Sequence, residues 1–502
     1  MSEDKGQKIL TIATKRGFIY PTAEIYTTTA GFWTYGHLGT LMKRKWEDLW
    51  RDYFLNLNDN FFEIEGSYIL PKAVFESSGH LKNFNDPLVS CSKCGYRARA
   101  DDLIEDNINK NVEGLSLKEL DATLKESKIV CPKCKNTTWG KAQYFNMMFD
   151  VKIGSLGNEI GYLSPETAQN PFLAYKRQIF ALRERLPMGL AMLGRVFRNE
   201  ISPRQGFYRL REFNQAELQI FFDPKKIDEV NNWSKVKNYK LRLALAKDKG
   251  KVKEITCEEA NSKLKLPKMY LYYAAKMQQF YLKALKIPKT KFRFRELAED
   301  ERAFYNKIHF DAEGDLETLG GFKELGGLHY RGDHDLGGHQ KGSKTKLELT
   351  DNGEKVLPHV LELSFGVDRN IWALFDMFFQ DKKDRSFFSF PSVVSPFHTT
   401  VFPLVKKDKK LVKKSREVYD LLRKDFKTFY DESGSIGKRY RRAEEVGINS
   451  MITVDFDTLN DNTITLRSRD TMQQVRVPID KLQEVLTKFL KGEKLYSLGK
   501  KV

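Results

Sequence analysis

Hydrophobic side chains recur at helical spacing in the segment GHLGTLMKRKWEDLWRDYFL, residues 36–55. Leu38, Met42, Trp46 and Trp50 stand four residues apart, which places them on one side of an α-helix. Residues 9–56 therefore predict a strand and a turn followed by an amphipathic helix that packs on a core.

The pattern changes several times after this helix. Residues 143–222 indicate short alternating strands around a helix, and residues 305–366 favour strands that lead into the helical segment IWALFDMFF. Between them, residues 223–290 are rich in lysine and indicate helices, as in NYKLRLALAKDKGKVKE. We interpret residues 223–290, and a polar segment at about 88–140, as insertions into a domain that covers residues 1–391.

A different pattern begins after FFSFPSVVSPF, residues 387–397. The apolar segment TTVFPLV predicts a strand, KKSREVYDLLRKDF a basic helix, and SMITVDF a further strand, followed by a strand pair and a final helix. Strands that alternate with helices over about a hundred residues are typical of a compact α/β domain. We therefore predict a second domain over residues 392–502.

Composition narrows the class of protein. The chain has 502 residues, of which 41% are hydrophobic and 30% charged, as in globular proteins of two or three domains. Its start, MSEDKGQKIL, is not a signal peptide, and no apolar run reaches membrane-spanning length, so we expect a cytoplasmic protein without a membrane partner. The net charge of +18 favours a polyanionic partner such as nucleic acid.

Four of the five cysteines form two CxxC pairs. They are Cys91 with Cys94 and Cys131 with Cys134, whereas Cys257 stands alone. Two such pairs can offer four thiolates to one structural zinc ion, which is their usual role inside cells. The alternative is four thiols without a metal.

The segment FRNEISPRQGFYRLREF, residues 197–213, carries an unusual set of charges for a hairpin. In strands, residues two apart share a face. One face would then carry Arg198 and Glu200, and the other strand would present Arg209, Arg211, Phe213, Gln215 and Glu217. Guanidinium groups match phosphate oxygens, and an aromatic ring can stack on a purine, so the hairpin can form a nucleotide site. The alternative is a hairpin with surface ion pairs, which contribute little stability.

A second charged element is HVLELSFGVDRN, residues 359–370. Glu362 and Ser364 share a strand face, Gly366 ends the strand, and Arg369 stands near the start of the next helix. An arginine there could meet the distal phosphates of a nucleotide. The alternative is a plain junction between a strand and a helix.

These segments resemble conserved motifs of a known enzyme class. FRNEISPR with RLREF is similar to motif 2 of class II aminoacyl-tRNA synthetases, and LSFGVDRN is similar to their motif 3. More narrowly, the chain resembles glycyl-tRNA synthetases of the homodimeric archaeal and eukaryotic type. Further strings that carry this resemblance include RGFIYPTAEIY, YLSPETAQN, KELGGLHYRGDHDL and GSIGKRYRRAEEVG, in order along the chain.

The resemblance implies both a fold and a reaction. The fold class is α+β, with an antiparallel sheet flanked by helices and a C-terminal α/β anticodon-binding domain. The reaction is that of a glycine–tRNA ligase, in which ATP and glycine form glycyl-adenylate and the glycyl group passes to the 3′ end of tRNA(Gly). Expected partners and cofactors are tRNA(Gly), glycine, ATP, Mg²⁺ and a second copy of the chain.

The same resemblance implies residues for ATP. Arg198 would hold the α-phosphate and Arg369 the γ-phosphate, Phe213 would stack on adenine, and Gly366 would allow close approach of the nucleotide. Glu324 could help to coordinate Mg²⁺ that bridges the phosphates. The remaining ATP residues would be Asn199, Glu200, Tyr208, Arg209, Arg211 and Leu325.

Glycine has no side chain to recognise, so the implied pocket depends on its ammonium group. The matching positions are Arg99, Glu166, Phe213, Gln215, Glu217, Glu362 and Ser364. Carboxylates that converge on an ammonium group compensate for missing side-chain contacts. A methylene contact discriminates by only about 1 to 3 kcal/mol, so alanine must be excluded sterically.

The C-terminal domain is expected to contact tRNA. We predict phosphate contacts from Lys438, Arg439, Arg441 and Arg442, because such residues position RNA. The run KKDKK is instead interpreted as a solvated turn.

The chain departs from the family pattern at a few positions. Ser164, Asn170 and Leu363 stand where the family usually has Arg, Gly and Pro, and Asn449 and Ser450 replace part of TPF. Two other functions share these motifs: a non-catalytic accessory protein that binds nucleic acid, and a synthetase for proline or threonine. The first should lack Arg198 and Arg369, and the second should lack the PETAQ and LELS strings.

Overall fold

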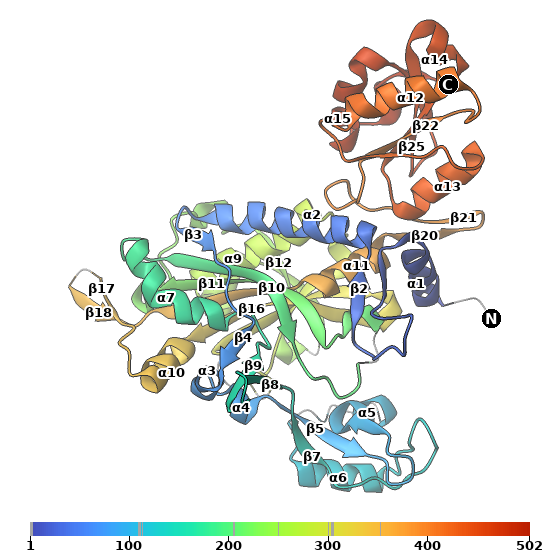
Figure 1. The fold of residues 1–502 in the computed structure, drawn as a ribbon. Helices are drawn as coiled ribbons and strands as arrows, with labels where there is room; N and C mark the ends of the chain where they lie inside the picture. The colour runs from blue at the N-terminus through green and yellow to red at the C-terminus, as the bar shows by residue number, and fades with distance from the viewer. Residues whose placement is uncertain are drawn as a thin grey trace.

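The computed structural model describes residues 4–108, 112, 114–203, 206–248, 250–299, 301–302, 306–351 and 353–502. Arg204, part of the charged segment quoted above, lies outside these ranges. The chain forms a large body around one sheet, a small domain at one end of it, and a C-terminal domain at the opposite end (Figure 1). None of the described helices is long and apolar enough to cross a lipid bilayer.

A nine-stranded sheet forms the centre of the large body. In spatial order its strands are β13 (Val252–Thr256), β12 (Lys240–Ala244), β14 (Phe292–Glu296), β15 (Ile308–Leu316), β16 (Gly321–Gly332), β19 (His359–Gly366), β11 (Glu212–Phe222), β10 (Met188–Phe197) and β3 (Phe61–Glu63). Neighbours are antiparallel except for β3 with β10 and β12 with β14. This confirms the predicted antiparallel core.

Helices cover one face of the sheet and part of the other. The first face packs on α2 (His37–Phe54), α9 (Lys268–Gln279) and α11 (Val367–Phe378), with α1 (Lys5–Arg16) and α8 (Cys257–Leu264) beside them. Met42, Trp46 and Trp50 are buried in this core, so the helix predicted for residues 36–55 is confirmed. On the other face, α7 (Gln169–Ala181) and α10 (His334–Ser343) cover one end and leave the middle strands open to the site.

The lysine-rich segment 238–254 is not helical, contrary to the prediction. It forms the hairpin of β12 and β13, which extends the sheet at one edge. Leu241, Leu243 and Leu245 are buried at every second position, which is the period of a strand, although Ala244 between them is also buried. Of the lysines in this segment, Lys240, Lys247, Lys251 and Lys253 are exposed, so the lysine content reflects exposure rather than helix formation.

Smaller sheets lie around the nine-stranded sheet. Three of them are pairs of strands: β1 (Ile19–Pro21) with β2 (Trp33–Tyr35), β17 (Leu349–Asp351) with β18 (Glu354–Val356), and β20 (Phe379–Lys382) with β21 (Arg385–Phe388). Another has the order β4 (Ile69–Pro71), β9 (Glu159–Leu163) and β8 (Phe149–Ile153), and lies beside α3 (Lys72–Ser77) and α4 (His80–Asn83). The small domain contains β6 (Arg97–Arg99), β5 (Asn85–Ser90) and β7 (Gln143–Asn146) with α5 (Ala100–Ile108) and α6 (Leu117–Glu126).

The C-terminal domain is α/β, as predicted. Its sheet has the order β23 (Thr428–Tyr430), β22 (Thr399–Pro403), β24 (Ser450–Val454), β25 (Thr463–Ser468), β26 (Gln474–Pro478) and β27 (Lys500–Lys501). Helices α12 (Lys409–Leu422) and α15 (Leu482–Leu490) pack on one face and α13 (Ile436–Val446) on the other, with α14 (Phe456–Asp461) beside α12. The pattern analysis did not include α13.

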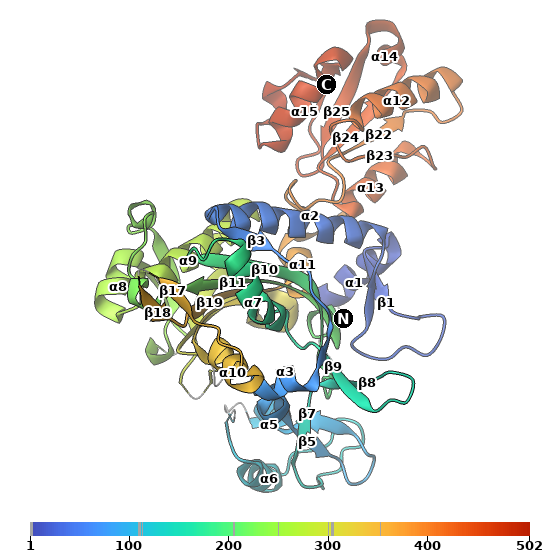
Figure 2. The ribbon, with the colours of Figure 1, turned by 60° about the vertical axis from the view of Figure 1, so that its left-hand side comes forward.

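The C-terminal domain lies next to α2 of the large body (Figure 2). Lys45 of α2 donates a hydrogen bond to the carbonyl oxygen of Ser395 at 2.7 Å. Arg385 of β21 pairs with Glu444 of α13 at 3.0 Å. These contacts hold the two domains side by side.

Candidate active site

The open face of the sheet is lined by polar side chains from neighbouring strands. On β11, Phe213, Gln215 and Glu217 share this face, whereas Ala216 and Leu218 point into the core. The face predicted for these three residues is therefore confirmed. The arginines are placed differently, because β10 ends at Phe197 and β11 begins at Glu212.

Arg198, Glu200, Arg209 and Arg211 consequently lie in the loop between the two strands and not within them. Sequence alternation cannot place loop residues, which explains the incorrect prediction. The loop nevertheless folds back over the sheet. It lines a small pocket with residues of β19 and α11: Arg198, Glu200, Tyr208, Arg209, Leu210, Phe213, Gly366, Asp368 and Arg369.

Two arginines, Arg198 and Arg369, line this pocket. The Arg198 guanidinium lies 5.3 Å from the centre of the Phe213 ring, and its Nε donates to the carbonyl oxygen of Pro165 at 3.0 Å. Arg369 lies over the Tyr208 ring at 5.0 Å and pairs with Glu324 at 2.8 Å. An aromatic ring and an oxygen atom thus hold each guanidinium in place, and both arginines also border the pocket.

Of the remaining residues predicted for ATP, Glu200, Tyr208 and Arg209 line the pocket, whereas Asn199, Arg211 and Leu325 do not. Arg209 pairs with Glu200 at 2.8 Å, and Arg211 donates to the carbonyl oxygens of Glu200 and Ala30. Asn199 donates its backbone N–H to Met147. Leu325 is buried in the hydrophobic core, and only its carbonyl, which accepts from Asn370, is polar. The structure therefore does not bring the Leu325 side chain into this pocket.

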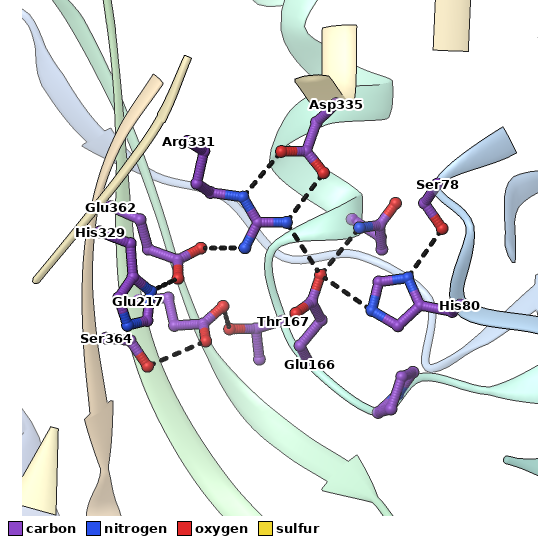
Figure 3. A network of polar contacts seen from close by, with 12 residues as sticks. Ser78, His80, Glu166, Thr167, Glu217, His329, Arg331, Asp335, Glu362 and Ser364 are labelled. Atoms are coloured by element: carbon purple, nitrogen blue, oxygen red, sulfur yellow. Dashed lines mark hydrogen bonds and ion pairs between the residues drawn. The ribbon is translucent and has the colours of Figure 1, made fainter. Parts of the chain in front are cut away.

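Next to the pocket lies a buried cluster of carboxylates (Figure 3). Glu217 accepts hydrogen bonds from the hydroxyl of Thr167 at 2.7 Å and from that of Ser364 at 3.2 Å. Burial, and then the charges of Glu362 and Glu166, raise the pKa of Glu217 well above its ordinary value. Glu217 is the carboxyl of this cluster without a cationic partner within ion-pair distance among the described residues.

Arg331 holds the other carboxylates in place. Its guanidinium pairs with Asp335 at 2.7 and 2.8 Å, donates to Glu362 at 3.0 Å, and lies 3.6 Å from Glu166 (Figure 3). Glu362 also accepts from Gln219 at 2.7 Å and contacts His329. These cations lower the pKa of Glu362 below its ordinary value despite its burial, which opposes the shift.

Glu166 has its own partners on the opposite side of the cluster. Its carboxylate accepts from Gln169 at 2.8 Å and lies 3.5 Å from Nε2 of His80. The charges of His80 and Arg331 outweigh burial and lower its pKa. Sequence reasoning assigned no role to His80, His329, Arg331 or Asp335. For the last three, their place within KELGGLHYRGDHDL was the available signal.

Arg99 lies in the small domain, where its ion pairs are with Asp86, Asp101 and Asp102 and not with the described carboxylates of the cluster. It pairs with Asp101 at 2.6 Å and lies 3.6 Å from Asp86. In the same domain, Asp102 pairs with Arg209 of the loop at 3.0 Å. Helix α5 thus connects the small domain directly with the loop that lines the pocket.

The four cysteines of the CxxC pairs meet in this small domain. Their sulfur atoms lie within 4.8 Å of one another, and the Cys91–Cys134 and Cys94–Cys131 separations are both 3.6 Å. Four sulfurs bound at about 2.3 Å to one tetrahedral zinc ion would lie about 3.8 Å apart. The cluster therefore fits a metal ion, whereas Cys257 is buried in the large core, away from it.

The basic segment of the C-terminal domain forms α13, and its residues face different ways. Lys438 and Arg441 are exposed, and Arg442 pairs with Asp431 at 2.7 Å. Arg439 is only 1% exposed and donates to backbone carbonyls of Pro403 and Gly434. Contrary to the prediction, the Arg439 side chain is not available for RNA, because it supports the domain from inside.

The departures from the family pattern occupy supporting positions. Ser164 is buried at the end of β9, and Leu363 points from β19 into the core. Asn170 donates to the carbonyl oxygen of Ser67 at 2.9 Å, and Asn449 to that of Phe390 at 3.0 Å. None of these side chains makes a hydrogen bond or ion pair to the carboxylate cluster.

Comparisons with known proteins agree with this geometry. The family described as tRNA synthetase class II core domain (G, H, P, S and T) matches residues 154–378, and the anticodon binding domain family matches residues 398–489. Curated proteins named glycine–tRNA ligase are similar over nearly their whole length. That of Aeropyrum pernix is 35% identical and covers 99% of both chains, and that of Thermococcus gammatolerans is 36% identical over 98% of this chain and 99% of its own.

The protein of the same name from Pyrococcus furiosus is 36% identical over 98% of this chain and all of its own. These matches confirm the resemblance that was drawn from the motifs. The chain belongs to the glycine–tRNA ligase family of class II aminoacyl-tRNA synthetases.

Proposed function

We propose that this protein activates glycine with ATP to form glycyl-adenylate and diphosphate, and then transfers the glycyl group to the 3′ end of tRNA(Gly). The observation that carries this proposal is the joint placement of Arg198 and Arg369 around one pocket with a buried carboxylate cluster beside it. The similar proteins named glycine–tRNA ligase support the choice of amino acid.

The proposed chemistry depends on alignment and charge. The carboxylate of glycine is already a nucleophile at neutral pH, so its attack on the α-phosphate needs no general base. Arg198 stabilises charge that develops on the α-phosphate, and Arg369 binds the γ-phosphate of the leaving diphosphate. Phe213 stacks on adenine, while Glu200, Arg209 and the nearby loop hold the nucleotide.

The ammonium group of glycine is assigned to the carboxylate cluster. Glu217 has no cationic partner among its described contacts, so it is the carboxylate that gains most from a bound ammonium group. Ser364, whose hydroxyl donates to Glu217, forms the wall that excludes a methyl group. Glu324 is 48% exposed and would hold Mg²⁺, which neutralises phosphate charge when bound.

The proposal also covers the metal site, the tRNA contacts, the domain boundary, the oligomeric state and the location of the protein. The cysteine cluster is assigned to structural zinc, and Lys438, Arg441 and Arg442 to tRNA phosphates. The domain boundary at residues 391 and 392, the homodimer and the cytoplasmic location stay predictions. An accessory protein without catalysis is disfavoured, because Arg198, Glu200 and Arg369 are present and lie in one pocket.

The test is amino-acid-dependent exchange between ATP and pyrophosphate, with glycine, alanine, serine, proline and threonine compared. We expect exchange with glycine only. Exchange with another amino acid would keep the reaction and overturn the specificity. Absence of exchange, also after addition of tRNA, would support the accessory function instead.

A further inference from the structure

His329 is oriented by its contact with the carboxylate cluster. Its Nδ1 contacts Oε1 of Glu362 (Figure 3). A carboxylate can only accept a hydrogen bond, so the proton of this contact belongs to Nδ1 of the imidazole. The other oxygen of Glu362 accepts from Gln219 at 2.7 Å and from Arg331 at 3.0 Å. His329 is therefore the donor that binds one of the two oxygens.

A glycine makes room for this imidazole. A Cβ atom built on Gly327 would lie 2.3 Å from Nε2 of His329, so the ring covers the α-carbon of residue 327. Gly327 stands opposite Ser364 in the register of β16 and β19, and His329 stands opposite Glu362. The ring therefore lies along the open face of the sheet, on the side of the proposed amino-acid pocket.

A second histidine, on the neighbouring strand β15, packs against the ring of His329. The centres of the His329 and His309 rings are 4.1 Å apart, and the ring planes meet at 80°. Nε2 of His309 lies 3.0 Å from Asp311, and Asn306 approaches its Nδ1 at 3.3 Å. Arg295 lies 3.3 Å from Asp311. His329 thus lies between a fixed carboxylate and a fixed ring.

We propose that His329, supported by His309 and seated over Gly327, is a positioning residue that fixes the Glu362 carboxylate for the ammonium group of the amino-acid substrate. This inference rests on the proposed function. Glu362 needs a fixed orientation because glycine offers only its two charged ends for recognition. A carboxylate held by His329 from one side and Arg331 from the other cannot rotate away from the pocket.

The test measures KM for glycine, KM for ATP and kcat of pyrophosphate exchange in variants of the full chain. His329→Leu removes the donor, and we expect KM for glycine to rise about tenfold or more, since hydrogen bonds to charged groups have this magnitude. KM for ATP should stay within about twofold of wild type. His329→Asn, which keeps an N–H near the position of Nδ1, should recover a large part of the loss.

Gly327→Ala provides an independent test without changing the histidine. The added Cβ would displace the ring, so KM for glycine should rise as in His329→Leu. Gly337→Ala is the matched control, because a Cβ built on Gly337 meets no atom within 4 Å. Gly327 lies within β16 and Gly337 within α10, the helix that follows this strand, so Gly337→Ala shows whether a methyl group added without a clash changes KM for glycine.

A double-mutant cycle with Glu362→Gln shows whether His329 acts through Glu362. We expect His329→Leu to change KM for glycine by less than about twofold in the Glu362→Gln background. The proposal is overturned if His329→Leu and Gly327→Ala leave KM for glycine unchanged, or if they raise KM for ATP equally. It is also overturned if the effects of His329→Leu and Glu362→Gln on KM for glycine are additive. Failure of the proposed function is distinguished by wild-type protein that shows no glycine-dependent exchange.

Discussion

Arg331 and Asp335 form a bidentate ion pair in the interior, with Nε–Oδ2 and Nη2–Oδ1 distances of 2.7 and 2.8 Å. Both side chains are 1% exposed. Arg331 comes from the end of β16 and Asp335 from the start of α10, so the pair joins the sheet to the helix that follows it. The same guanidinium reaches two carboxylates of the proposed glycine pocket.

Loss of this guanidinium should destabilise the fold. Arg331→Met leaves Asp335, Glu362 and Glu166 buried without their shared cation, and breaking a buried pair costs about 3 to 5 kcal/mol. Urea denaturation measures the free energy of unfolding. Arg185→Met is the control, because Arg185 is 54% exposed and its pair with Asp59 should contribute less than about 1 kcal/mol. Equal effects of the two substitutions would contradict the role given to Arg331.

Loss of Arg198 should affect catalysis rather than folding. We expect Arg198→Ala to lower the rate of pyrophosphate exchange by a factor of about 100 to 1,000, the usual effect of removing one group that stabilises transition-state charge. Arg195→Ala is the control, since Arg195 lies in β10 shortly before the loop, is 64% exposed and pairs with Glu212. Wild-type exchange in Arg198→Ala would remove this residue from the site.

The raised pKa of Glu217 predicts a pH dependence of stability. In the unfolded chain, Glu217 loses its proton above the ordinary pKa of about 4.3, whereas the raised pKa in the folded chain favours the protonated form. The free energy of unfolding of the ligand-free protein therefore falls as the pH rises toward the folded-state pKa. Glu217→Gln removes this contribution to the pH dependence of stability, because glutamine does not titrate. Its melting temperature should fall less than that of wild type between about pH 5 and about pH 8, while its KM for glycine rises. Parallel melting curves would show that Glu217 is ionised in the free protein.

The cysteine cluster predicts a metal content that can be measured. Elemental analysis of the purified protein should find one zinc ion per chain, and Cys91→Ser should lose it. Cys257→Ser should keep the metal, because Cys257 lies in another core. Zinc that is retained in Cys91→Ser, or a wild-type protein without metal that is fully folded, would contradict a structural zinc site.

Helix α13 predicts two different effects of removing its basic side chains. Lys438→Ala and Arg441→Ala should raise KM for tRNA and lower its salt dependence by about one phosphate contact each, without changing pyrophosphate exchange. Arg439→Ala should instead lower the melting temperature, since Arg439 is buried. Lys407→Ala, on an exposed turn, serves as the control for general charge loss. Identical tRNA kinetics in all four variants would remove α13 from the RNA interface.

The parts of the site that lie in regular strands could be predicted from the sequence. Alternation places Phe213, Gln215 and Glu217 on one face, and the same rule places Glu362 with Ser364. Alternation was also present at Leu241, Leu243 and Leu245, where the lysine content led to an incorrect helix. In this segment, the spacing of the leucines was therefore a better guide to secondary structure than the lysine content.

Other parts depend on contacts that no local pattern contains. Arg331 binds Glu166, which is 165 positions earlier in the chain, and the pairing exists only after β16 and α7 are brought together. The burial of Arg439 was accessible in principle, because Ile436, Arg439, Tyr440 and Ala443 follow helical spacing toward the core. A charged residue on an apolar helix face indicates a structural arginine.

The alternation of faces along β11 and β19 has a consequence for redesign of substrate choice. On these strands Phe213, Gln215, Glu217, Glu362 and Ser364 lie on the face of the proposed pocket, whereas Ala216, Leu218, Leu363 and Phe365 belong to the hydrophobic core. A library restricted to positions 213, 215, 217, 362 and 364 would therefore vary recognition while it leaves the packing of Ala216, Leu218 and Leu363 intact. Selection for a new amino acid on this scaffold would need a check of folding mainly at position 362, because Glu362 belongs to the buried ion-pair network of Arg331.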